Sequence, residues 1–120
     1  MAENIIKVKS FSFALRVVKL YQFLNQEKRE YVISKQLLRS GTSVGTLVRE
    51  SEQAESKLDF IHKLAIAQKE ANESDYWLEL LYQSEYLDET QFQSLKLDIV
   101  EINKILASII ITTKQKIGKK

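Results

Sequence analysis

The fold class follows from one stretch of the chain, residues 56–81, which reads SKLDFIHKLAIAQKEANESDYWLELL. Within it, apolar or small side chains recur every three or four residues, at Phe60, Leu64, Ala67, Ala71, Ser74, Leu78 and Leu81. This spacing places them on one face of an α-helix, with a period near 3.5 that is typical of the core of a helical bundle. Ser56 and Asp59 occupy the two positions of an N-terminal capping box, so the helix is predicted to begin near Lys57.

The same periodicity continues on both sides of this stretch. Upstream it runs through Ile33, Leu37, Ser40, Val44, Leu47, Ser51 and Ala54, and downstream through Phe92, Leu95, Ile99, Ile102, Leu106 and Ile109. Asp88 and Gln91 repeat the spacing of a capping box, and Leu87 and Phe92 occupy the positions of a hydrophobic staple. We therefore expect helices over about residues 11–26, 31–55, 57–84 and 89–117.

The composition agrees with long helices and short connections. The 120 residues include no Pro and only three Gly, so few residues favour turns. Because all-β folds need many turns, we predict an all-α, antiparallel, up-down four-helix bundle that forms a single domain over residues 1–120. The absence of Cys excludes disulfide bonds, zinc–thiolate sites and thiol nucleophiles. It also agrees with a cytoplasmic location.

No segment is predicted to be a signal peptide or to cross a membrane. Residues 1–9 lack the apolar core of a signal peptide. The longest apolar run, residues 105–111, is interrupted by Ser108 and is shorter than the ~18 residues of a membrane span.

Two glycines interrupt the second predicted helix, where each would cost about 1 kcal/mol relative to Ala in an exposed position. If this helix folds back onto the third at Ser56, residue i faces roughly residue 113 − i, because both helices have the same rise per residue. This register places Gly41 near Asn72 and Gly45 near Gln68. We therefore predict close packing of the second helix on the third at these glycines. A hinge or a ligand contact at Gly41 is the alternative.

The first predicted helix carries more apolar surface than a monomer needs. Apolar residues fill an arc of roughly 180°, whereas a helix that covers one core needs an arc of about 100°. This arc contains Phe11, Phe13, Ala14, Val17, Val18, Leu20, Tyr21 and Leu24. The last helix shows a similar excess at Leu97, Val100, Ala107 and Ile111. Because large apolar faces are normally covered by a partner, we expect a homo-oligomer.

Charge is strongly segregated along the chain. Residues 1–49 contain nine Lys/Arg and three Asp/Glu (net +6), residues 50–101 contain four and thirteen (net −9), and residues 102–120 contain five and none (net +5). Folding of the first two helices is expected to gather a basic patch from Arg16, Lys19, Lys35, Arg39 and Arg49. Together with the hydroxyls of Thr42 and Thr46, such a patch would bind the phosphates of RNA or DNA.

Two other interpretations of the charge remain open. Lysines from both termini, Lys7, Lys9 and those of residues 114–120, meet at one end of the predicted bundle. There they would complement a helix dipole or simply remain solvated. The basic patch would alternatively dock on the acidic region of a neighbouring subunit and so serve assembly.

The residue types of a catalytic or metal site are largely missing. His62 is the only histidine, and no Gly-x-Ser-x-Gly motif occurs. A di-iron bundle requires Glu-x-x-His pairs on two helices, whereas this chain has one Asp-x-x-His pair, Asp59 and His62, in the first turn of a helix. We therefore expect a non-catalytic protein without a cofactor, a metal or a small-molecule substrate. A metal-binding bundle is the least favoured alternative.

Several motifs occur in the order found in one bacterial protein family. They are Lys9-Ser10-Phe11, Phe13-Ala14-Leu15-Arg16, QLLRSGTSVG (36–45), Arg49-Glu50, SKLDFI (56–61), LAIAQKEA (64–71) and YWLELL (76–81). Over residues 9–112 the chain resembles the four-helix bundle proteins related to those encoded within intervening sequences of 23S ribosomal RNA genes.

The resemblance implies a bundle assembled as a ring-shaped homopentamer. It also implies relatedness to the accessory proteins of diversity-generating retroelements, which bind nucleic acid, and it supplies no catalytic residues. Of the basic patch, Arg16, Arg39 and Arg49 lie within the motifs. Our hypothesis is a weak, sequence-independent nucleic-acid-binding accessory protein. The alternative is a structural or scaffolding homo-oligomer with a protein partner.

Overall fold

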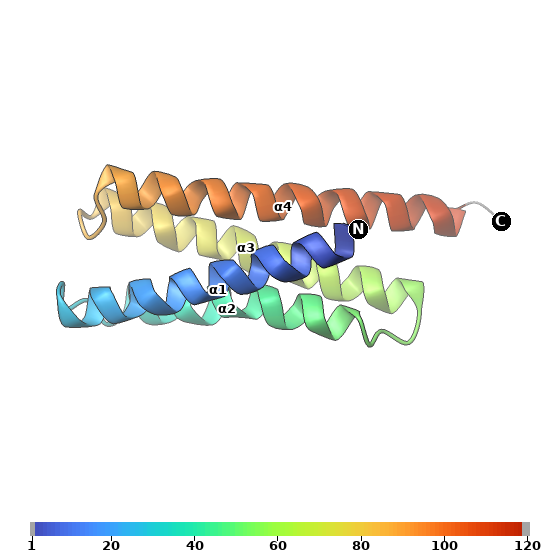
Figure 1. Cartoon of the computed structure of the whole chain (residues 1–120), viewed down its shortest axis with the longest axis horizontal. Helices are drawn as coiled ribbons and strands as arrows, with labels where there is room; N and C mark the ends of the chain where they lie inside the picture. The colour runs from blue at the N-terminus through green and yellow to red at the C-terminus, as the bar shows by residue number, and fades with distance from the viewer. Residues whose placement is uncertain (1, 119–120) are drawn as a thin grey trace.

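Four α-helices account for the regular structure of residues 2–118, the part of the chain that the computed structural model describes (Figure 1). They are α1 (Ala2–Gln26), α2 (Ile33–Ser51), α3 (Lys57–Gln83) and α4 (Glu89–Gly118). The molecule is an elongated bundle of 55 × 22 × 20 Å. This confirms the prediction of an all-α four-helix bundle.

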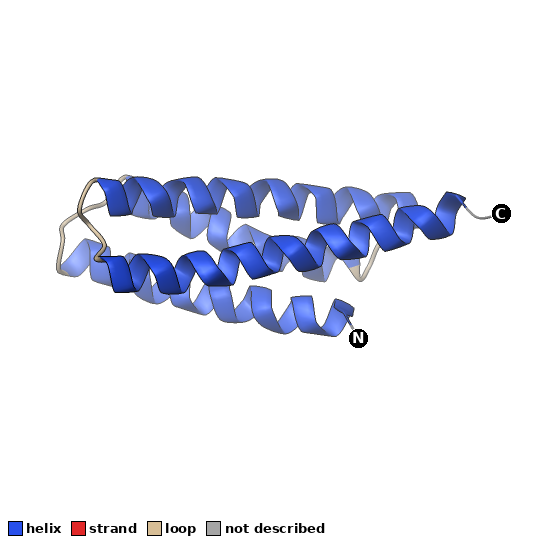
Figure 2. Ribbon diagram, turned by 90° about the horizontal axis from the view of Figure 1, so that it is seen from above, coloured by secondary structure: helices blue, strands red, loops and turns tan. Residues whose placement is uncertain are grey.

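Each helix packs on two others. The backbones of α1 and α2, α2 and α3, α3 and α4, and α4 and α1 lie side by side, whereas in the described residues the backbones of α1 and α3, and of α2 and α4, do not approach closely. The α1–α2 and α3–α4 connections lie at one end of the long axis, and the α2–α3 connection lies toward the other end (Figure 2). The helices α1 and α3 are therefore diagonal partners on opposite sides of the core.

The starts of α3 and α4 have the local structure that their sequences predict. At α3, the Asp59 amide donates to Ser56 Oγ (3.0 Å), and the Asp59 carboxylate accepts from the Glu55 amide (3.2 Å). At α4, the Gln91 amide donates to Asp88 Oδ1 (2.7 Å), and Gln91 Oε1 accepts from the Asp88 amide (3.0 Å). These bonds satisfy amides that have no partner inside the helix, which is why α3 begins at Lys57 and α4 at Glu89.

The first two helices differ from the expected bounds. Helix α1 begins at Ala2 and not near residue 11, because the periodicity of buried side chains continues upstream through Ser10 and Ile6. Helix α2 spans residues 33–51 and not 31–55. At its C-terminus the hydrogen bonds join residues three positions apart, as in a 3₁₀-helix; for example, the Glu52 amide donates to the Arg49 carbonyl. The extended backbone at Ser56 then starts α3.

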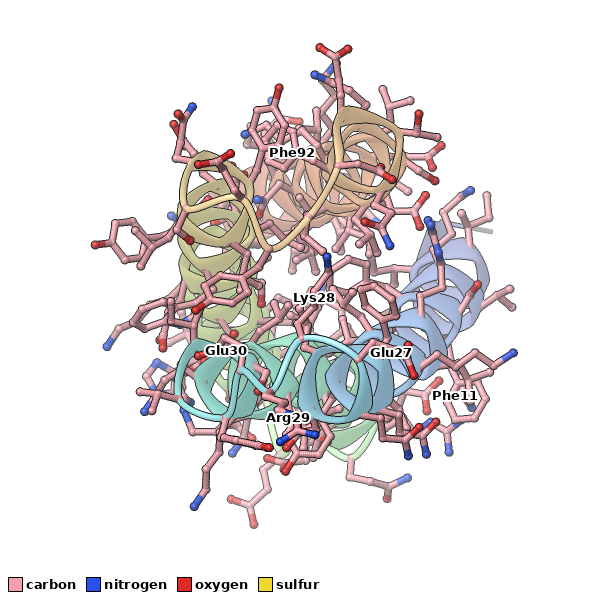
Figure 3. All side chains as sticks on the ribbon, turned by 90° about the vertical axis from the view of Figure 1, so that its left-hand side faces the viewer. Phe11, Glu27, Lys28, Arg29, Glu30 and Phe92 are labelled. Atoms are coloured by element: carbon pink, nitrogen blue, oxygen red, sulfur yellow. The ribbon has the colours of Figure 1, made fainter. Side chains whose placement is uncertain are left out.

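A buried carboxylate, which the sequence analysis did not single out, fixes the start of α2. Glu30 is only 7 % exposed, and its two carboxylate oxygens accept hydrogen bonds from the amides of Val32 (3.0 Å), Ile33 (2.9 Å) and Ser34 (2.7 Å). Ser34 Oγ returns a bond to the Glu30 carbonyl (2.9 Å). The negative charge lies at the positive end of the helix dipole, so it stabilises α2 through both hydrogen bonding and electrostatics. Glu30 is seen at the connection end of the bundle in Figure 3.

The core follows the predicted stripes closely in α3 and α4. All six residues of the predicted α4 stripe are buried. In α3 the stripe from Leu64 to Leu81 is buried, although Ile61 takes the place expected of Phe60, which is only partly buried. Leu87 and Phe92 are both buried, as a hydrophobic staple requires.

The predicted register of α2 against α3 is confirmed, but the role assigned to the glycines is wrong. Ser74 Oγ donates to Ser40 Oγ across the α2–α3 seam (2.8 Å), close to the expected pairing. Gly41 and Gly45 instead face α1. A Cβ on Gly41 would lie 2.9 Å from a methyl carbon of Val17, and one on Gly45 would lie 3.5 Å from the carbonyl oxygen of Ser10. A residue next to Ser40 is turned by about 100° around the helix, which carries it from the α3 side to the α1 side.

Candidate nucleic-acid interface

Arg16 is held in the seam between α1 and α4. Its Nη1 lies 2.5 Å from Asp98 Oδ2, and its Nη2 donates to Ser94 Oγ (2.8 Å). Position 16 lies on the side of α1 that faces α4, so the guanidinium reaches across to the neighbouring helix. The Arg16 guanidinium, which we predicted to bind phosphate, is therefore already paired with a carboxylate of the same chain.

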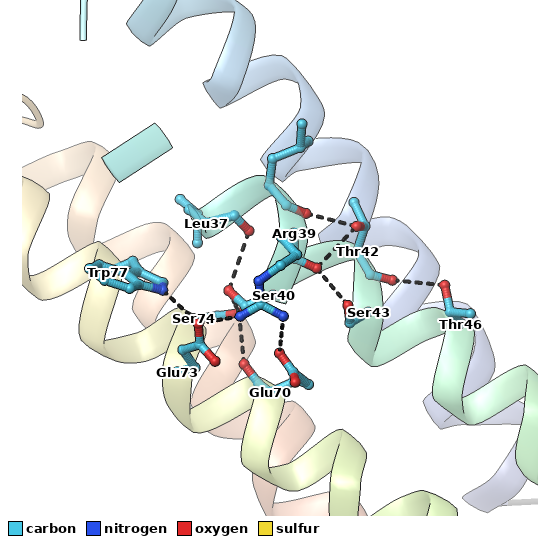
Figure 4. Close-up of polar contacts among 11 residues, drawn as sticks. Leu37, Arg39, Ser40, Thr42, Ser43, Thr46, Glu70, Glu73, Ser74 and Trp77 are labelled. Atoms are coloured by element: carbon cyan, nitrogen blue, oxygen red, sulfur yellow. Dashed lines mark hydrogen bonds and ion pairs between the residues drawn. The ribbon is translucent and has the colours of Figure 1, made fainter. Parts of the chain in front are cut away.

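Arg39 is held in the seam between α2 and α3 (Figure 4). It makes ion pairs with Glu70 (3.1 Å) and with Glu73. The hydrogen bond from Arg39 lowers the pKa of Glu73 below its ordinary value, and the same bond raises the pKa of Arg39. Trp77 Nε1 also donates to Glu73 Oε1 (3.1 Å). The arrangement joins the two helices by charge and by an indole hydrogen bond.

The structure does not bring the predicted basic residues into one patch. Arg16 turns toward α4 and Arg39 toward α3, so their guanidinium groups lie in different seams. Lys19 and Lys35 are exposed, and neither forms an ion pair with the described side chains of residues 5–118. The sequence reasoning placed residues correctly along the helices but did not determine which way each long side chain turns.

Arg49 packs on an aromatic ring of α1. Its guanidinium carbon lies 5.1 Å from the centre of the Phe11 ring, a cation–π distance. The two side chains border a groove of about 240 Å³ between α1 and α2, which is lined by Phe11, Ala14, Thr42, Gly45, Thr46 and Arg49. Gly45 helps to form this groove because it has no side chain. Arg49 makes no ion pair with any described residue, so its charge is free.

The hydroxyls on the outer face of α2 already have hydrogen-bond acceptors. Thr42 Oγ1 donates to the Leu38 carbonyl (2.7 Å), and Thr46 Oγ1 donates to the Thr42 carbonyl (3.2 Å) (Figure 4). Ser43 Oγ donates to the Arg39 carbonyl (2.6 Å). A hydroxyl has one proton to donate, so these groups offer only acceptor lone pairs to a ligand. A phosphate would therefore find its donors among the ammonium and guanidinium groups.

The terminal lysines are partly neutralised. Lys7 pairs with Glu52 (3.2 Å), and Lys9 pairs with Glu101 (3.0 Å). Lys114 and Lys116 are exposed on the last turns of α4. Lys119 and Lys120 lie outside the described residues. The basic end of the predicted bundle is thus less positive than the sequence alone indicates.

A stripe of apolar side chains runs along the outer face of α1. It comprises Ile5, Val8, Phe11, Leu15 and Val18, which are between 38 % and 69 % exposed, and we call it the α1 stripe. The core-facing residues Ile6, Phe13 and Val17 lie on the opposite side of the same helix. Phe11 is seen on the outside of the bundle in Figure 3. The apolar excess predicted for this helix is present, and it extends further toward the N-terminus than expected.

An open cavity of about 750 Å³ lies at the end of the bundle that holds the α1–α2 and α3–α4 connections. Its lining includes Phe23, Lys28, Tyr82 and Tyr86, together with the carboxylates Glu85 and Asp88. Tyr82 is stacked on the ring of Phe92, with centroids 4.4 Å apart. The single lysine beside two carboxylates makes this a poor phosphate site. The aromatic side chains therefore act mainly in packing, at the end of the hydrophobic core.

Two other features bear on alternative functions. Among the residues described, no three His, Cys, Asp or Glu side chains lie close enough together to hold a metal ion. His62 is exposed on α3, and the neighbouring Asp59 is used in the cap of that helix. No helix in residues 2–118 combines the length and apolar character needed to cross a bilayer.

Comparisons with known proteins place the chain in a family. The sequence profile of the 23S rRNA-intervening sequence protein family matches residues 2–108. The chain is also similar to a crystal structure from Bacteroides thetaiotaomicron VPI-5482, described as a protein of unknown function from the S23 ribosomal protein family. Identity is 57 %, the TM-score is 0.91, and the match covers 92 % of this chain and 98 % of the other. No curated protein matches. The family match covers α1, α2, α3 and residues 89–108 of α4, and the chain belongs to the 23S rRNA-intervening sequence protein family.

Proposed function

We propose that this chain is a non-catalytic, cytoplasmic subunit of a ring-shaped homopentamer of antiparallel, up-down bundles. The assembled protein binds RNA or DNA weakly and without sequence preference. The observation that carries the assembly is the α1 stripe, because five exposed apolar side chains on one face of one helix are costly to leave in water. The number of five subunits is taken from the family resemblance.

The free cations of α1 and α2 support the nucleic-acid part of the proposal. Lys19, Lys35 and Arg49 are exposed and make no ion pair with other described residues. Three cations on one small subunit bind phosphates weakly, but a ring repeats them in every subunit. Once one subunit has bound a long strand, binding of the same strand by the other subunits is intramolecular. The assembly therefore binds a long strand more tightly than one subunit does. The protein requires no cofactor, metal or small-molecule substrate for this activity.

A titration with fluorescent RNA and DNA oligomers at low and physiological salt tests this function. The variant Lys19→Ala/Lys35→Ala/Arg49→Ala removes the free cations, and the control Lys57→Ala/Lys104→Ala/Lys116→Ala removes the same charge from α3 and α4. We expect salt-sensitive binding by the wild type and the control, and at least tenfold weaker binding by the first variant. Light scattering verifies that all three proteins have the same assembled mass. Equal binding by the variant and the control would refute the assignment of these residues.

A scaffold that binds a protein partner is the second candidate. It is favoured by the ion pairs of Arg16 and Arg39, which leave fewer free cations than a dedicated nucleic-acid-binding protein presents. An assembled wild-type protein that binds neither RNA nor DNA at low salt would support the scaffold and reject nucleic-acid binding.

A further inference from the structure

The open cavity of about 750 Å³ at the end of the bundle combines aromatic rings with carboxylates, and we call it the end cavity. Its rings come from Phe23 of α1, Tyr82 of α3 and Tyr86 of the α3–α4 connection. They pack at the end of the core but are only partly buried, so part of each ring borders the cavity. The faces of aromatic rings attract cations, and pockets of this size take small organic molecules.

The carboxylates of the end cavity are not neutralised by neighbouring cations. Glu85 and Asp88 line it, and neither forms an ion pair with the described side chains of residues 5–118. In the cap of α4, Asp88 uses Oδ1 to accept from the Gln91 amide (2.7 Å), which leaves Oδ2 for a ligand. The surroundings are acidic as well, because residues 70–95 contain seven Asp/Glu and no Lys/Arg. The end cavity therefore favours a positively charged ligand.

One cation of the chain itself already lies over a ring of the end cavity. Lys28 Nζ is 6.0 Å from the centre of the Phe23 ring, the outer limit of a cation–π contact. Figure 3 views the bundle from this end and shows Lys28 between the two connections. Lys28 is exposed and makes no ion pair with the described side chains, so it can turn away at little cost. The place above Phe23 thus attracts an ammonium group and is open to one from a ligand.

The backbone at Glu85 is unusual for its residue type. Its φ of 70° lies in the left-handed region, where Gly or Asn is usual after the end of a helix. The amides of Tyr86 and Leu87 donate to the Leu81 carbonyl (2.9 and 3.3 Å), which closes the turn. A Glu in this conformation is less stable than a Gly would be, and strained residues of this kind cluster at binding sites. Here the strained residue supplies one of the two carboxylates of the end cavity.

From these observations we infer that the end cavity binds an organic cation with alkylammonium or guanidinium groups, from a free polyamine or from the basic side chains of a peptide. One cationic group of the ligand replaces the Lys28 ammonium above Phe23, and a second pairs with Glu85 and Asp88. Its aliphatic part lies along the tyrosine rings. A hydrated Mg²⁺ fits less well, because it gives up its water reluctantly and gains little from aromatic rings. The site goes beyond the proposed function and uses none of the three free cations of α1 and α2.

Isothermal titration calorimetry of the whole chain at fixed ionic strength tests this site. Spermidine represents a polyamine, and a terminally blocked Arg-Gly-Arg peptide represents basic side chains. Hexaamminecobalt(III) has the same charge as spermidine but no carbon atoms, so it measures the effect of charge alone. The variant Glu85→Gln/Asp88→Asn removes both carboxylates and keeps the cap of α4, because Asn is as good an N-cap as Asp. The control, Glu50→Gln/Glu55→Gln, removes the same charge near the α2–α3 connection, and circular dichroism verifies the fold of each protein.

We expect the wild type and the control to bind the organic cations equally well, and the tighter of spermidine and the peptide identifies the source of the cation. Glu85→Gln/Asp88→Asn should bind about tenfold more weakly. Phe23→Leu should weaken binding of the organic cations about two- to fivefold and leave binding of hexaamminecobalt(III) unchanged. Lys28→Met keeps a long side chain but removes the competing ammonium, so this variant should bind more tightly than the wild type.

Three results would overturn the inference. They are a wild type that binds neither spermidine nor the peptide, equal binding by the wild type and Glu85→Gln/Asp88→Asn, and binding of hexaamminecobalt(III) as tight as that of the organic cations. The last result would mean that charge alone accounts for the binding and that the rings take no part. These outcomes are separate from those of the nucleic-acid titration, which changes residues on other surfaces.

Discussion

Replacement of Gly41 by Ala measures how closely α1 and α2 approach. A Cβ on Gly41 would lie 2.9 and 3.1 Å from the two γ-methyl carbons of Val17 and 3.4 Å from its Cβ. Carbon atoms in ordinary contact are about 3.5–4.0 Å apart. Val17 is fully buried, and its β-branched side chain has essentially one rotamer in a helix, so it has little freedom to move away.

Two opposing terms set the magnitude of this effect. Ala is more favourable than Gly in a helix interior by about 1 kcal/mol. Overpacking of a well-packed core typically costs about 1–3 kcal/mol. The clash is therefore expected to outweigh or cancel the propensity gain, and Gly41→Ala should destabilise the protein by about 0–2 kcal/mol.

Gly45→Ala is the matched control, because it makes the same change one turn later in the same helix. Its new Cβ would lie 3.5 Å from the Ser10 carbonyl oxygen, which is ordinary contact. This variant should keep the gain in helix propensity of Ala over Gly and be about 0.5–1 kcal/mol more stable than the wild type. Urea unfolding followed by far-ultraviolet circular dichroism, at one fixed protein concentration, gives both values.

Val17→Ala completes a double-mutant cycle. It removes the two methyl groups that Gly41→Ala would meet, so in this background Gly41→Ala should stabilise by about 1 kcal/mol. The reasoning is refuted if Gly41→Ala is as stable as Gly45→Ala in the wild-type background. That result would mean that the contact between α1 and α2 is loose enough to accept a methyl group.

Three further outcomes are expected. Glu30→Ala removes the carboxylate that accepts three amides at the start of α2 and should lower the free energy of unfolding by about 1–2 kcal/mol, measured by urea titration. The lowered pKa of Glu73 means that its pair with Arg39 stabilises the fold above the ordinary pKa of 4.5 and is lost as pH falls through the lower folded value. Glu73→Gln should therefore be about 0.5–1 kcal/mol less stable than the wild type at pH 7, and this difference should shrink as the pH falls below 4.5. For duplex DNA, a contact through the three free cations predicts a slope of log K against log salt of about −2.7 for each bound subunit; a slope near zero in filter-binding measurements would exclude a phosphate contact.

The sequence predicted the fold well where a local rule determines the structure. Ser56 with Asp59, and Asp88 with Gln91, cap their helices as their spacing requires. Such caps depend only on residues three positions apart, so neighbouring helices do not alter them. The buried stripe of α4 was predictable because large apolar side chains recur along it at helical spacing, although Leu97 and Ile111 remain exposed outside it.

Errors arose where two faces of a helix had similar composition. Small residues occur on adjacent sides of α2, with Ser40 toward α3 and Gly41 toward α1. Sequence alone did not reveal which neighbour each side meets. Glu30 was missed because a carboxylate in a run of charged residues is normally solvated, and its burial depends on the path of the whole α1–α2 connection.

Part of the charge that is segregated along the chain is paired inside the bundle. Of the nine basic residues in residues 1–49, four are paired with acidic residues of positions 50–101, namely Lys7, Lys9, Arg16 and Arg39. Each pair joins α1 or α2 to the acidic part of the chain, so a pattern that suggested an external partner is partly satisfied inside one molecule. Two more cations, Lys28 and Arg29, lie in the connection at the end of the bundle. The cations left on the outer faces of α1 and α2 are therefore few, and a repeated assembly is the means by which so few charges would hold a polyanion.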